Sequence, residues 1–231
     1  MLSPRRRRRY DGAMELVVEN LACARAGRRV FAGVGFTVRA GEAALLTGPN
    51  GAGKSSLLRV LAGLIPPQAG AARLGAASLG AEREAFQEQV AYAGHLDAVK
   101  PQLGVADNLA LWARLYGGGG VAAALETFGL SRIADLPAAY CSAGQKRRLG
   151  LARLLVAGRR LWLLDEPTVS LDAASVAVFA DVVRAHLARG GLAIAATHAP
   201  LGLEGGPRIE MAPPQAAAPA ADDPFLGEAW S

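Results

Sequence analysis

An α/β fold with a mainly parallel sheet and helices on both faces is predicted by two observations. The first is a glycine-rich stretch, residues 48–56, which fits G-x-x-x-x-G-K-[ST] and lies between an apolar run at 43–46 and a helical pattern at 56–62. The second is a pair of fully apolar segments, 161–164 and 192–196. Continuous apolar strands between helices are typical of a parallel sheet that is buried on both faces. Together they indicate a P-loop fold.

The glycine-rich stretch has the chemistry of a triphosphate-binding loop. Glycines let successive backbone N–H groups face inward, and the N-terminus of the next helix adds partial positive charge. Lys54 would reach the β- and γ-phosphates, and the Ser55 hydroxyl would ligate Mg²⁺. The expected nucleotide-binding residues are Gly48, Pro49, Asn50, Gly51, Ala52, Gly53, Lys54, Ser55 and Ser56.

Composition limits the classes of protein to which the chain can belong. Of the 231 residues, 52% are hydrophobic, but no run of about 18 apolar residues could cross a bilayer. Five of the 25 Lys and Arg residues lie at 5–9, and the other 20 equal the acidic residues in number, so we expect no nucleic-acid-binding domain. No apolar stretch follows these arginines, which excludes a secretory signal. Cys23 and Cys141 lack zinc or disulfide-framework spacing and fit a reducing cytoplasm.

We expect three regions along the chain. Residues 1–13 are a disordered basic leader, which is a solvated tail or touches anionic lipid or nucleic acid. Residues 14–203 form one ATPase domain, with an inserted helical subdomain at about 95–157. Residues 204–231 are rich in Pro and Ala and form a loose tail.

The part of the domain before the glycine-rich stretch predicts a small antiparallel sheet. Apolar residues run together at 14–18 and alternate with other residues at 34–38. We place the hairpin turn at Arg28 and Arg29, after Gly27.

The rest of the domain alternates between helices and strands. Residues 70–80 give a weak signal for one short strand, and 82–89 form a short helix or loop. The other expected elements are strands at 90–93, 161–164 and 192–196 and helices at 105–116, 121–128, 146–156 and 173–189.

Two carboxylates follow the apolar strand at 161–164. The carboxyl ends of such strands are where open α/β sheets bind ligands. Asp165 would hold Mg²⁺, directly or through water, and Glu166 would orient and polarise the attacking water. An acidic helix start after a strand is the structural alternative, and the nearby P-loop motif disfavours it.

A second diagnostic stretch precedes the helix expected at 146–156. Ser142 and Gln145 have the S-x-x-Q spacing of a capping box, which by itself marks only the start of a helix. Gly144 leaves this helix N-terminus open to close approach, and helix N-termini attract phosphate.

With these motifs in this order, the chain resembles the ATP-binding subunits of ABC transporters over roughly residues 14–203. Residues 141–145 are similar to the signature L-S-G-G-Q of that family. The resemblance implies that the signature of one subunit caps the ATP bound by the P-loop of the other. Two copies of the chain would then sandwich two ATP molecules. The signature residues are Ser142, Ala143, Gly144 and Gln145.

The resemblance also assigns single residues. It implies that Glu166 is the catalytic glutamate, that Asp172 lies in the D-loop at the dimer seam, and that His198 is the switch histidine contacting the γ-phosphate. His95 stands at the Q-loop position, where the family usually has glutamine. It would supply a nitrogen to the Mg²⁺ shell or the attacking water, or else contact a partner.

The aromatic residue that stacks on adenine in this family is also missing. Its position aligns with Arg25 or Ala26. The planar guanidinium of Arg25 would stack on the base, or else adenine would be held weakly.

The chain also resembles the cytochrome c maturation ATPases, a bacterial subfamily. The resemblance lies in these two departures and in residues 92–101, 142–148 and 168–172. The resemblance implies a peripheral subunit at the cytoplasmic face of the inner membrane, acting with permease-type integral-membrane partners (CcmB- or CcmC-like). ATP hydrolysis would drive haem export or release of a haem–chaperone complex. Nothing supports haem binding by this chain, which lacks C-x-x-C-H and has three histidines, of which His186 is expected to be solvated.

Three other interpretations of the sequence remain. The first two are the ATPase subunit of another small-molecule ABC transporter and a soluble ABC-type ATPase acting on DNA or ribosomes. The latter carry two cassettes, coiled-coil arms or zinc modules, which this sequence lacks. A binding module with a dead ATPase is disfavoured by the intact Lys54, Asp165, Glu166 and His198.

Overall fold

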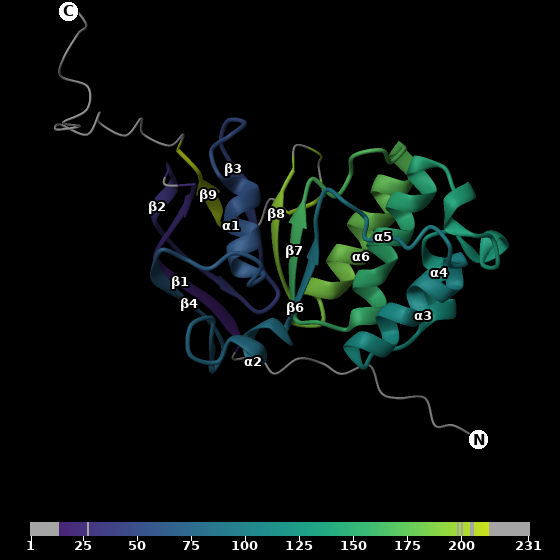
Figure 1. The fold of residues 1–231 in the computed structure, drawn as a ribbon, viewed down its shortest axis with the longest axis horizontal. Coiled ribbons are helices and arrows are strands. Elements are labelled where there is room, and N and C mark those ends of the chain that lie inside the picture. Colours follow the sequence, from purple (N-terminus) through teal and green to yellow (C-terminus); the bar gives the residue numbers. More distant parts are fainter. Residues whose placement is uncertain (1–13, 27, 198, 200, 204–205, 213–231) are drawn as a thin grey trace, which may run out of the picture.

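The computed structural model describes residues 14–26, 28–197, 199, 201–203 and 206–212. The leader expected at 1–13, most of the tail expected at 204–231, and His198 lie outside the described residues. Two sheets organise the described part: a four-stranded antiparallel sheet in the order β2-β1-β4-β5 and a five-stranded sheet in the order β6-β7-β8-β3-β9. Figure 1 shows the antiparallel sheet at one end, α1 beside it, and the larger helical block at the other end.

The antiparallel sheet confirms the prediction for the start of the domain, with longer strands. It consists of β1 (Glu15–Arg25), β2 (Arg28–Arg39), β4 (Ala69–Leu74) and β5 (Ala77–Ser78). The predicted turn at Arg28 and Arg29 is wrong, because Arg28 already pairs with Arg25 inside the sheet. Ala26, with φ of 47°, turns the chain earlier.

Residues 70–80 contribute two strands instead of the one expected. β4 pairs with β1 along most of its length, and β5 pairs with β4. Alanine and glycine have low strand propensity, so here pairing with a neighbouring strand outweighs the local preference.

The second sheet is wholly parallel, as predicted. It contains β3 (Ala43–Thr47), β6 (Val90–Ala93), β7 (Leu161–Asp165), β8 (Leu192–Ala196) and β9 (Arg208–Glu210). Every residue of β7 and β8 is buried. Because β7 and β8 run parallel, their carboxyl ends meet at one edge of the sheet.

The short strand β9 differs from the expectation of a loose tail from residue 204. It pairs with β3, and Ile209, opposite Leu46, is buried in the core. Three residues with one apolar side chain are too few to give a periodic signal. The sheet therefore extends past residue 203.

The helices match the predicted positions closely. They are α1 (Lys54–Leu61), α2 (Arg83–Gln87), α3 (Val105–Tyr116), α4 (Val121–Thr127), α5 (Ala143–Ala157) and α6 (Ala173–Leu187), with short 3₁₀ helices η1 (Ser131–Ile133) and η2 (Ala138–Tyr140). α5 begins earlier than the expected residue 146 because its cap is Ser142. In the part of the chain that is described, no helix has the length and apolar character needed to cross a membrane.

Two apolar cores lie on the two faces of the parallel sheet. Leu161 and Leu163 of β7 pack into one core, shared with α1 and the antiparallel sheet. Trp162 and Leu164 point to the other core, which is shared with α3, α4, α5 and α6. Successive strand residues face opposite sides, so one strand serves both cores. The predicted helical block therefore packs on one face of the sheet.

His186 was expected to be solvated, and this expectation is wrong. Its side chain on α6 is 1% exposed, and its ring stacks on Trp162 with centroids 3.9 Å apart and planes 7° apart. Nε2 lies 3.0 Å from the Arg160 carbonyl and 3.2 Å from the Leu192 carbonyl, so this nitrogen carries the proton. Burial lowers the pKa of His186 to about 4. A Cβ at Gly191 would lie 2.3 Å from the ring, so glycine makes the room.

Candidate nucleotide site

The predicted phosphate loop joins β3 to α1, as the motif requires. Three of its glycines, Gly48, Gly51 and Gly53, have φ of 133°, 83° and 93°. Side chains other than glycine rarely adopt such angles. At Gly48 a Cβ would also lie 2.3 Å from the Met211 carbonyl oxygen, so the loop passes directly against the residue that follows β9.

The Lys54 ammonium folds back over this loop. Its Nζ donates to the carbonyl oxygens of Gly48 at 2.6 Å and Pro49 at 3.0 Å. The charge therefore lies at the mouth of the loop, where the oxygens of a phosphate would replace these carbonyls as acceptors.

Ser55 and Asp165, the two residues predicted to hold Mg²⁺, lie together. The Ser55 hydroxyl donates to Oδ1 of Asp165 at 2.8 Å, and Asp165 is 4% exposed. The Tyr92 hydroxyl donates to the other carboxylate oxygen at 3.1 Å. The pKa of Tyr92 is raised, mainly because the side chain is buried. The hydroxyl therefore stays a neutral donor.

This donor set fits a magnesium ion. A hydroxyl and a carboxylate are hard oxygen ligands, and Mg²⁺ typically takes one or two protein ligands and completes its shell with phosphate oxygens and water. Within the described ranges no group of three His, Cys, Asp or Glu residues could hold a metal by itself. Ser55 and Asp165 are therefore suited to a metal that arrives with a phosphate.

Glu166 follows at the end of β7 in a left-handed backbone conformation, with φ of 48°. Its amide donates to the Ala196 carbonyl at 2.8 Å, and its own carbonyl accepts from Nη2 of Arg147 at 2.6 Å. Glutamate rarely adopts this φ, and such a conformation persists only where its surroundings fix it. The carboxylate therefore stands on a backbone held from two sides.

The signature stretch forms the capping box that its spacing predicts. Ser142 Oγ accepts from the Gln145 amide at 3.2 Å, and the Ser142 amide donates to Oε1 of Gln145 at 2.7 Å. Ser142 and Ala143 are exposed, so the N-terminus of α5 faces solvent. A Cβ at Gly144 would lie 3.1 Å from the Ser170 carbonyl, which brings the segment before Asp172 against this helix end.

Asp172 caps α6 in the structure. Its Oδ1 accepts from the Ser175 amide at 2.7 Å, and this hydrogen bond lowers the pKa of Asp172. The cap is a structural role, and it does not exclude a second role at an interface between subunits.

Three other residues were predicted at the nucleotide site: His95, His198 and Arg25. His95 is the second residue after β6 and is exposed. His198 lies outside the described residues, two positions beyond the end of β8. Arg25 ends β1 and is exposed, and no described contact assigns it to a base.

Sequence reasoning missed Tyr92 and Arg147. A tyrosine in the otherwise apolar strand 90–93 was the available signal for Tyr92, whose neighbour across the sheet is Leu163 in β7. Arg147 lies in a run of three basic residues, and nothing in that run marks it as the buried one.

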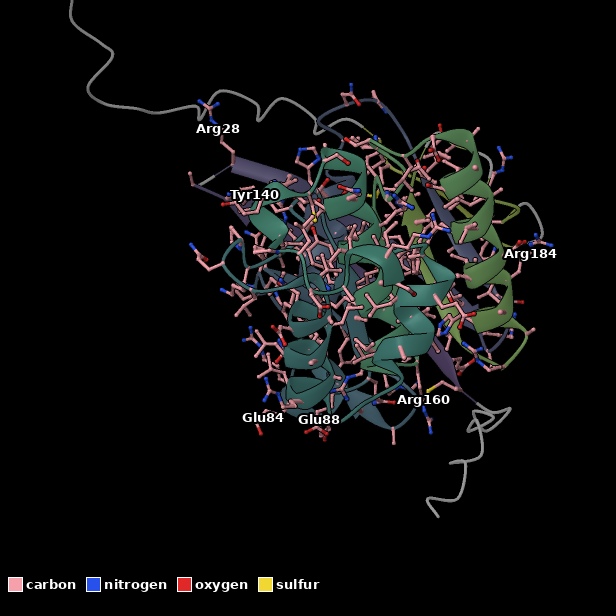
Figure 2. The ribbon with its side chains drawn as sticks, turned by 90° about the vertical axis from the view of Figure 1, so that its right-hand side faces the viewer. Arg28, Glu84, Glu88, Tyr140, Arg160 and Arg184 are labelled. Carbon is pink, nitrogen blue, oxygen red and sulfur yellow. The ribbon has the colours of Figure 1, made fainter. Side chains whose placement is uncertain are left out.

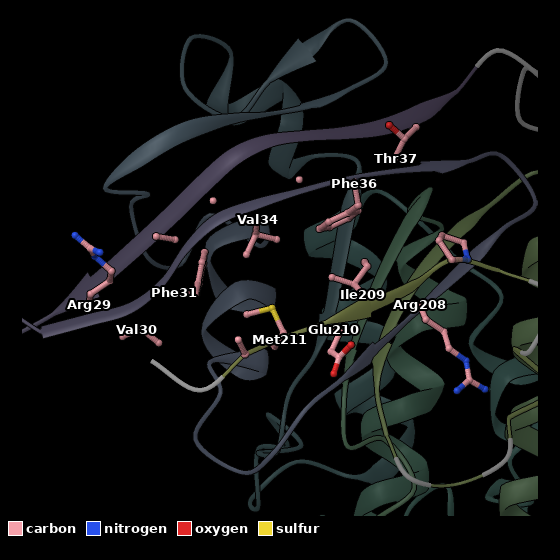
Figure 3. Close-up of a pocket in the computed structure, with 15 residues that line it drawn as sticks. Arg29, Val30, Phe31, Val34, Phe36, Thr37, Arg208, Ile209, Glu210 and Met211 are labelled. Atoms are coloured by element: carbon pink, nitrogen blue, oxygen red, sulfur yellow. The ribbon is translucent and has the colours of Figure 1, made fainter. Parts of the chain in front are cut away.

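A separate groove of about 710 Å³ lies between β2 and the segment 207–212. Figure 3 shows Val34 and Phe36 of β2 facing Ile209 and Met211 across it. Lys54, Ser55 and Asp165 do not line this groove, so it is not the site described above.

Comparison with known proteins identifies similar sequences along nearly the whole chain. A family model described as ABC transporter matches residues 31–169. The cytochrome c biogenesis ATP-binding export protein CcmA of Cereibacter sphaeroides is 54% identical over 218 residues, covering 93% of this chain and 99% of that protein. The protein of the same name from Ruegeria pomeroyi is 52% identical over 211 residues, covering 91% and 98%.

Solved structures share the fold. An ATP-binding subunit of an ABC transporter superposes with a TM-score of 0.73 and 26% identity over 79% of each chain. An ATP-binding cassette solved as a dimer with ADP and Pi, in a post-hydrolysis state, has a TM-score of 0.76 and 19% identity over 88% of this chain and 97% of that one. The second likeness concerns the fold alone.

Proposed function

This chain belongs to the ABC transporter family and, within it, to the cytochrome c biogenesis ATP-binding export proteins, and from this membership we propose that it is the ATP-hydrolysing subunit of a membrane complex of cytochrome c biogenesis. ATP hydrolysis is coupled to haem export or to release of a haem–chaperone complex. The observation that carries the catalytic part is the 2.8 Å hydrogen bond between Ser55 and Asp165 beside the phosphate loop.

The phosphate loop binds the β- and γ-phosphates of ATP. The ammonium of Lys54 exchanges its carbonyl partners for phosphate oxygens, and the N-terminus of α1 adds backbone donors. Ser55 and Asp165 would hold Mg²⁺, which would neutralise charge on the phosphates. The hydrogen bond from Tyr92 fixes the orientation of the Asp165 carboxylate.

Glu166 orients and polarises the water that attacks the γ-phosphate. It is the first residue after β7, at the edge where the parallel strands end. In the register of the sheet Asp165 lies opposite Ala196, so the chain leaves β8 beside this site. The assignment of His198 as the γ-phosphate contact is supported by its position two residues later.

A second copy of the chain completes each site. The exposed N-terminus of α5, with Ser142, Ala143, Gly144 and Gln145, binds the ATP held by the partner. The capping side chains of Ser142 and Gln145 fix this helix end, and the exposed Ala143 leaves it open to the phosphate of the partner's ATP. Asp172 lies at the seam between the copies.

The complex includes permease-type integral-membrane partners, and this subunit is peripheral to the cytoplasmic face of the inner membrane. Leu96 is 82% exposed and Tyr140 78% exposed, and Figure 2 shows Tyr140 at the molecular surface. The segment before Tyr140 contacts the segment after Leu96, because the amide of Ala139 donates to the carbonyl of Pro101 at 2.8 Å. Two exposed apolar side chains of this size suit contact with a membrane partner.

Purification of the chain with its membrane partners from a bacterium that makes c-type cytochromes tests the proposal. We expect integral-membrane subunits to co-purify and K54A to abolish assembly of haem-containing cytochrome c, measured by haem staining. Normal haem attachment in a K54A strain, with loss of another transported compound, would identify a different ABC transporter. A chain that never pairs or turns over ATP would overturn the proposal.

A further inference from the structure

Arg147 connects three parts of the nucleotide site from the buried side of α5. Its side chain is 5% exposed, yet it makes four hydrogen bonds. Nη2 donates to the carbonyl of Glu166 at 2.6 Å, and Nε donates to that of Pro167 at 2.9 Å. Nη1 donates to the carbonyl of Gly94 at 2.9 Å and to Oδ1 of Asp97 at 2.8 Å.

These contacts meet the backbone of Glu166 where it is least relaxed. Its left-handed conformation requires support from the surroundings. The amide of Glu166 is held by Ala196 in the sheet, whereas its carbonyl and that of the next residue are held by the Arg147 guanidinium. Without Arg147, the Glu166 carbonyl would lose its 2.6 Å hydrogen bond and keep the longer one from the Val169 amide at 3.4 Å, and the Pro167 carbonyl would lose the donor at Nε.

The other two contacts reach the loop that carries His95. Gly94 and Asp97 flank that histidine, and both bind the same Nη1 atom. The loop can approach α5 closely because residue 150 is glycine. A Cβ there would lie 2.9 Å from the Cβ of Asp97.

We propose that Arg147 is a positioning residue that holds Glu166 in its reactive orientation. It connects the backbone of Glu166 to the loop that carries His95 and to α5, so the orientation of Glu166 depends on how α5 packs against these two segments. The inference rests on the proposed role of Glu166. Arg147 touches no substrate. It acts through the backbone of Glu166, so turnover depends on it while nucleotide binding at the phosphate loop does not.

The geometry demands arginine. Only a guanidinium offers several donors in one rigid plane, and the ammonium of lysine is a point charge that cannot meet carbonyls on two separate loops at once. R147K therefore keeps a positive charge near Asp97 but loses the support of Glu166.

Arg153 on the same helix provides a matched control. It is also buried, donates to the carbonyl of Tyr92 at 2.7 Å and packs over the ring of Trp112. It has no described contact with residues 165–167. R153K thus removes a buried guanidinium from α5 without releasing Glu166. The lysine ammonium still donates to the backbone carbonyl of Tyr92, and the Tyr92 hydroxyl stays on Asp165.

The test measures kcat, KM, the ATP dissociation constant and the thermal midpoint of R147K and R153K in the complex with the membrane partners. We expect R147K to lose about 100-fold in kcat, which is the scale for a displaced reactive group, with KM and ATP affinity unchanged. R153K should keep the parent kcat even where its thermal midpoint falls as far. Equal loss of kcat in both variants, or a parent kcat in R147K, overturns the inference.

D97A separates the two arms and guards against a misfolded R147K. It removes the ion pair with the His95 loop and leaves the hydrogen bonds to the backbone carbonyls of Gly94, Glu166 and Pro167. We expect kcat to fall less in D97A than in R147K. In the double variant D97A/R147K we expect kcat to fall no further than in R147K, because the effects of coupled residues are not additive. Fully additive losses overturn the coupling.

E166Q distinguishes failure of this inference from failure of the proposed function. If E166Q keeps the parent turnover, the role of Glu166 itself is wrong. If E166Q is inactive and R147K is as active as the parent, only the role of Arg147 is wrong.

Discussion

Ser55 and Asp165 are separated by 110 positions in the chain, yet their side chains are joined by a 2.8 Å hydrogen bond. One follows the phosphate loop and the other ends β7, so the fold brings a hydroxyl and a carboxylate to the same edge of the sheet. Two hard oxygen ligands beside the phosphate loop are the donors that the proposed magnesium–nucleotide site needs from the protein.

D165N should lower ATPase turnover by at least about 100-fold and raise the Mg²⁺ concentration that gives half-maximal activity, because the amide keeps the shape but loses the charge that attracts the ion. Titration of Mg²⁺ at fixed ATP measures both effects. Y92F is the matched control, since it leaves the carboxylate in place and removes the hydroxyl that donates to its other oxygen, and it should cost about 2- to 10-fold, the range for one net hydrogen bond. An unchanged Mg²⁺ requirement in D165N would exclude this residue from the metal site.

K54A should weaken ATP binding about 10- to 100-fold, since a hydrogen bond to a charged group contributes roughly 1.5–3 kcal/mol. Equilibrium binding of a fluorescent ATP analogue measures the change. R114A removes one positive charge from an exposed position on α3 and should bind the analogue as the parent does. Equal affinity in K54A and the parent would contradict the phosphate role of Lys54.

E166Q should bind ATP with the parent affinity but accumulate a closed dimer, because the site still forms and the attacking water is no longer activated. Size-exclusion chromatography with ATP, compared with ADP, detects the dimer. The ADP run is the control, since without the γ-phosphate the parent and the variant should both elute as monomers. A variant that hydrolyses ATP at the parent rate would remove Glu166 from its assigned role.

The sequence predicted those parts of this site whose residues lie close together in the chain. The loop around Lys54 is fixed by neighbouring glycines, and the Ser142–Gln145 capping box by a three-residue spacing. The carboxylates at the end of β7 follow from the strand pattern alone. Such spacings can be recognised in the sequence without knowledge of the fold.

What the sequence did not reveal depends on contacts between distant segments. The partners of Arg147 lie 19 to 53 positions away, and hydrogen bonds to backbone carbonyls leave no residue pattern. β9 is held by pairing with β3, and the burial of His186 depends on a glycine across from its ring. Such features arise from tertiary packing, which outweighs local preference.

The buried His186 should make folding stability depend on pH. Its pKa is lowered to about 4 by burial, with a smaller contribution in the same direction from Arg189, whereas the unfolded chain has the ordinary value of 6.5. The unfolded state therefore binds the proton more readily. The stabilisation is fully present above pH 6.5 and is lost as the pH falls from 6.5 towards 4, with a total of about 3 kcal/mol.

Urea unfolding of the parent and of H186F between pH 7.5 and 4.5 tests this dependence. Phenylalanine keeps the stack on Trp162 but cannot titrate. H186F should therefore be less stable at pH 7.5, where the hydrogen bonds from His186 to the carbonyls of Arg160 and Leu192 are lost, and its stability should fall less steeply with acid. H95Q, at an exposed histidine, should follow the parent curve. Parallel curves for H186F and the parent would mean that His186 does not titrate in this range, and that its ring is protonated or neutral to the same extent in both states.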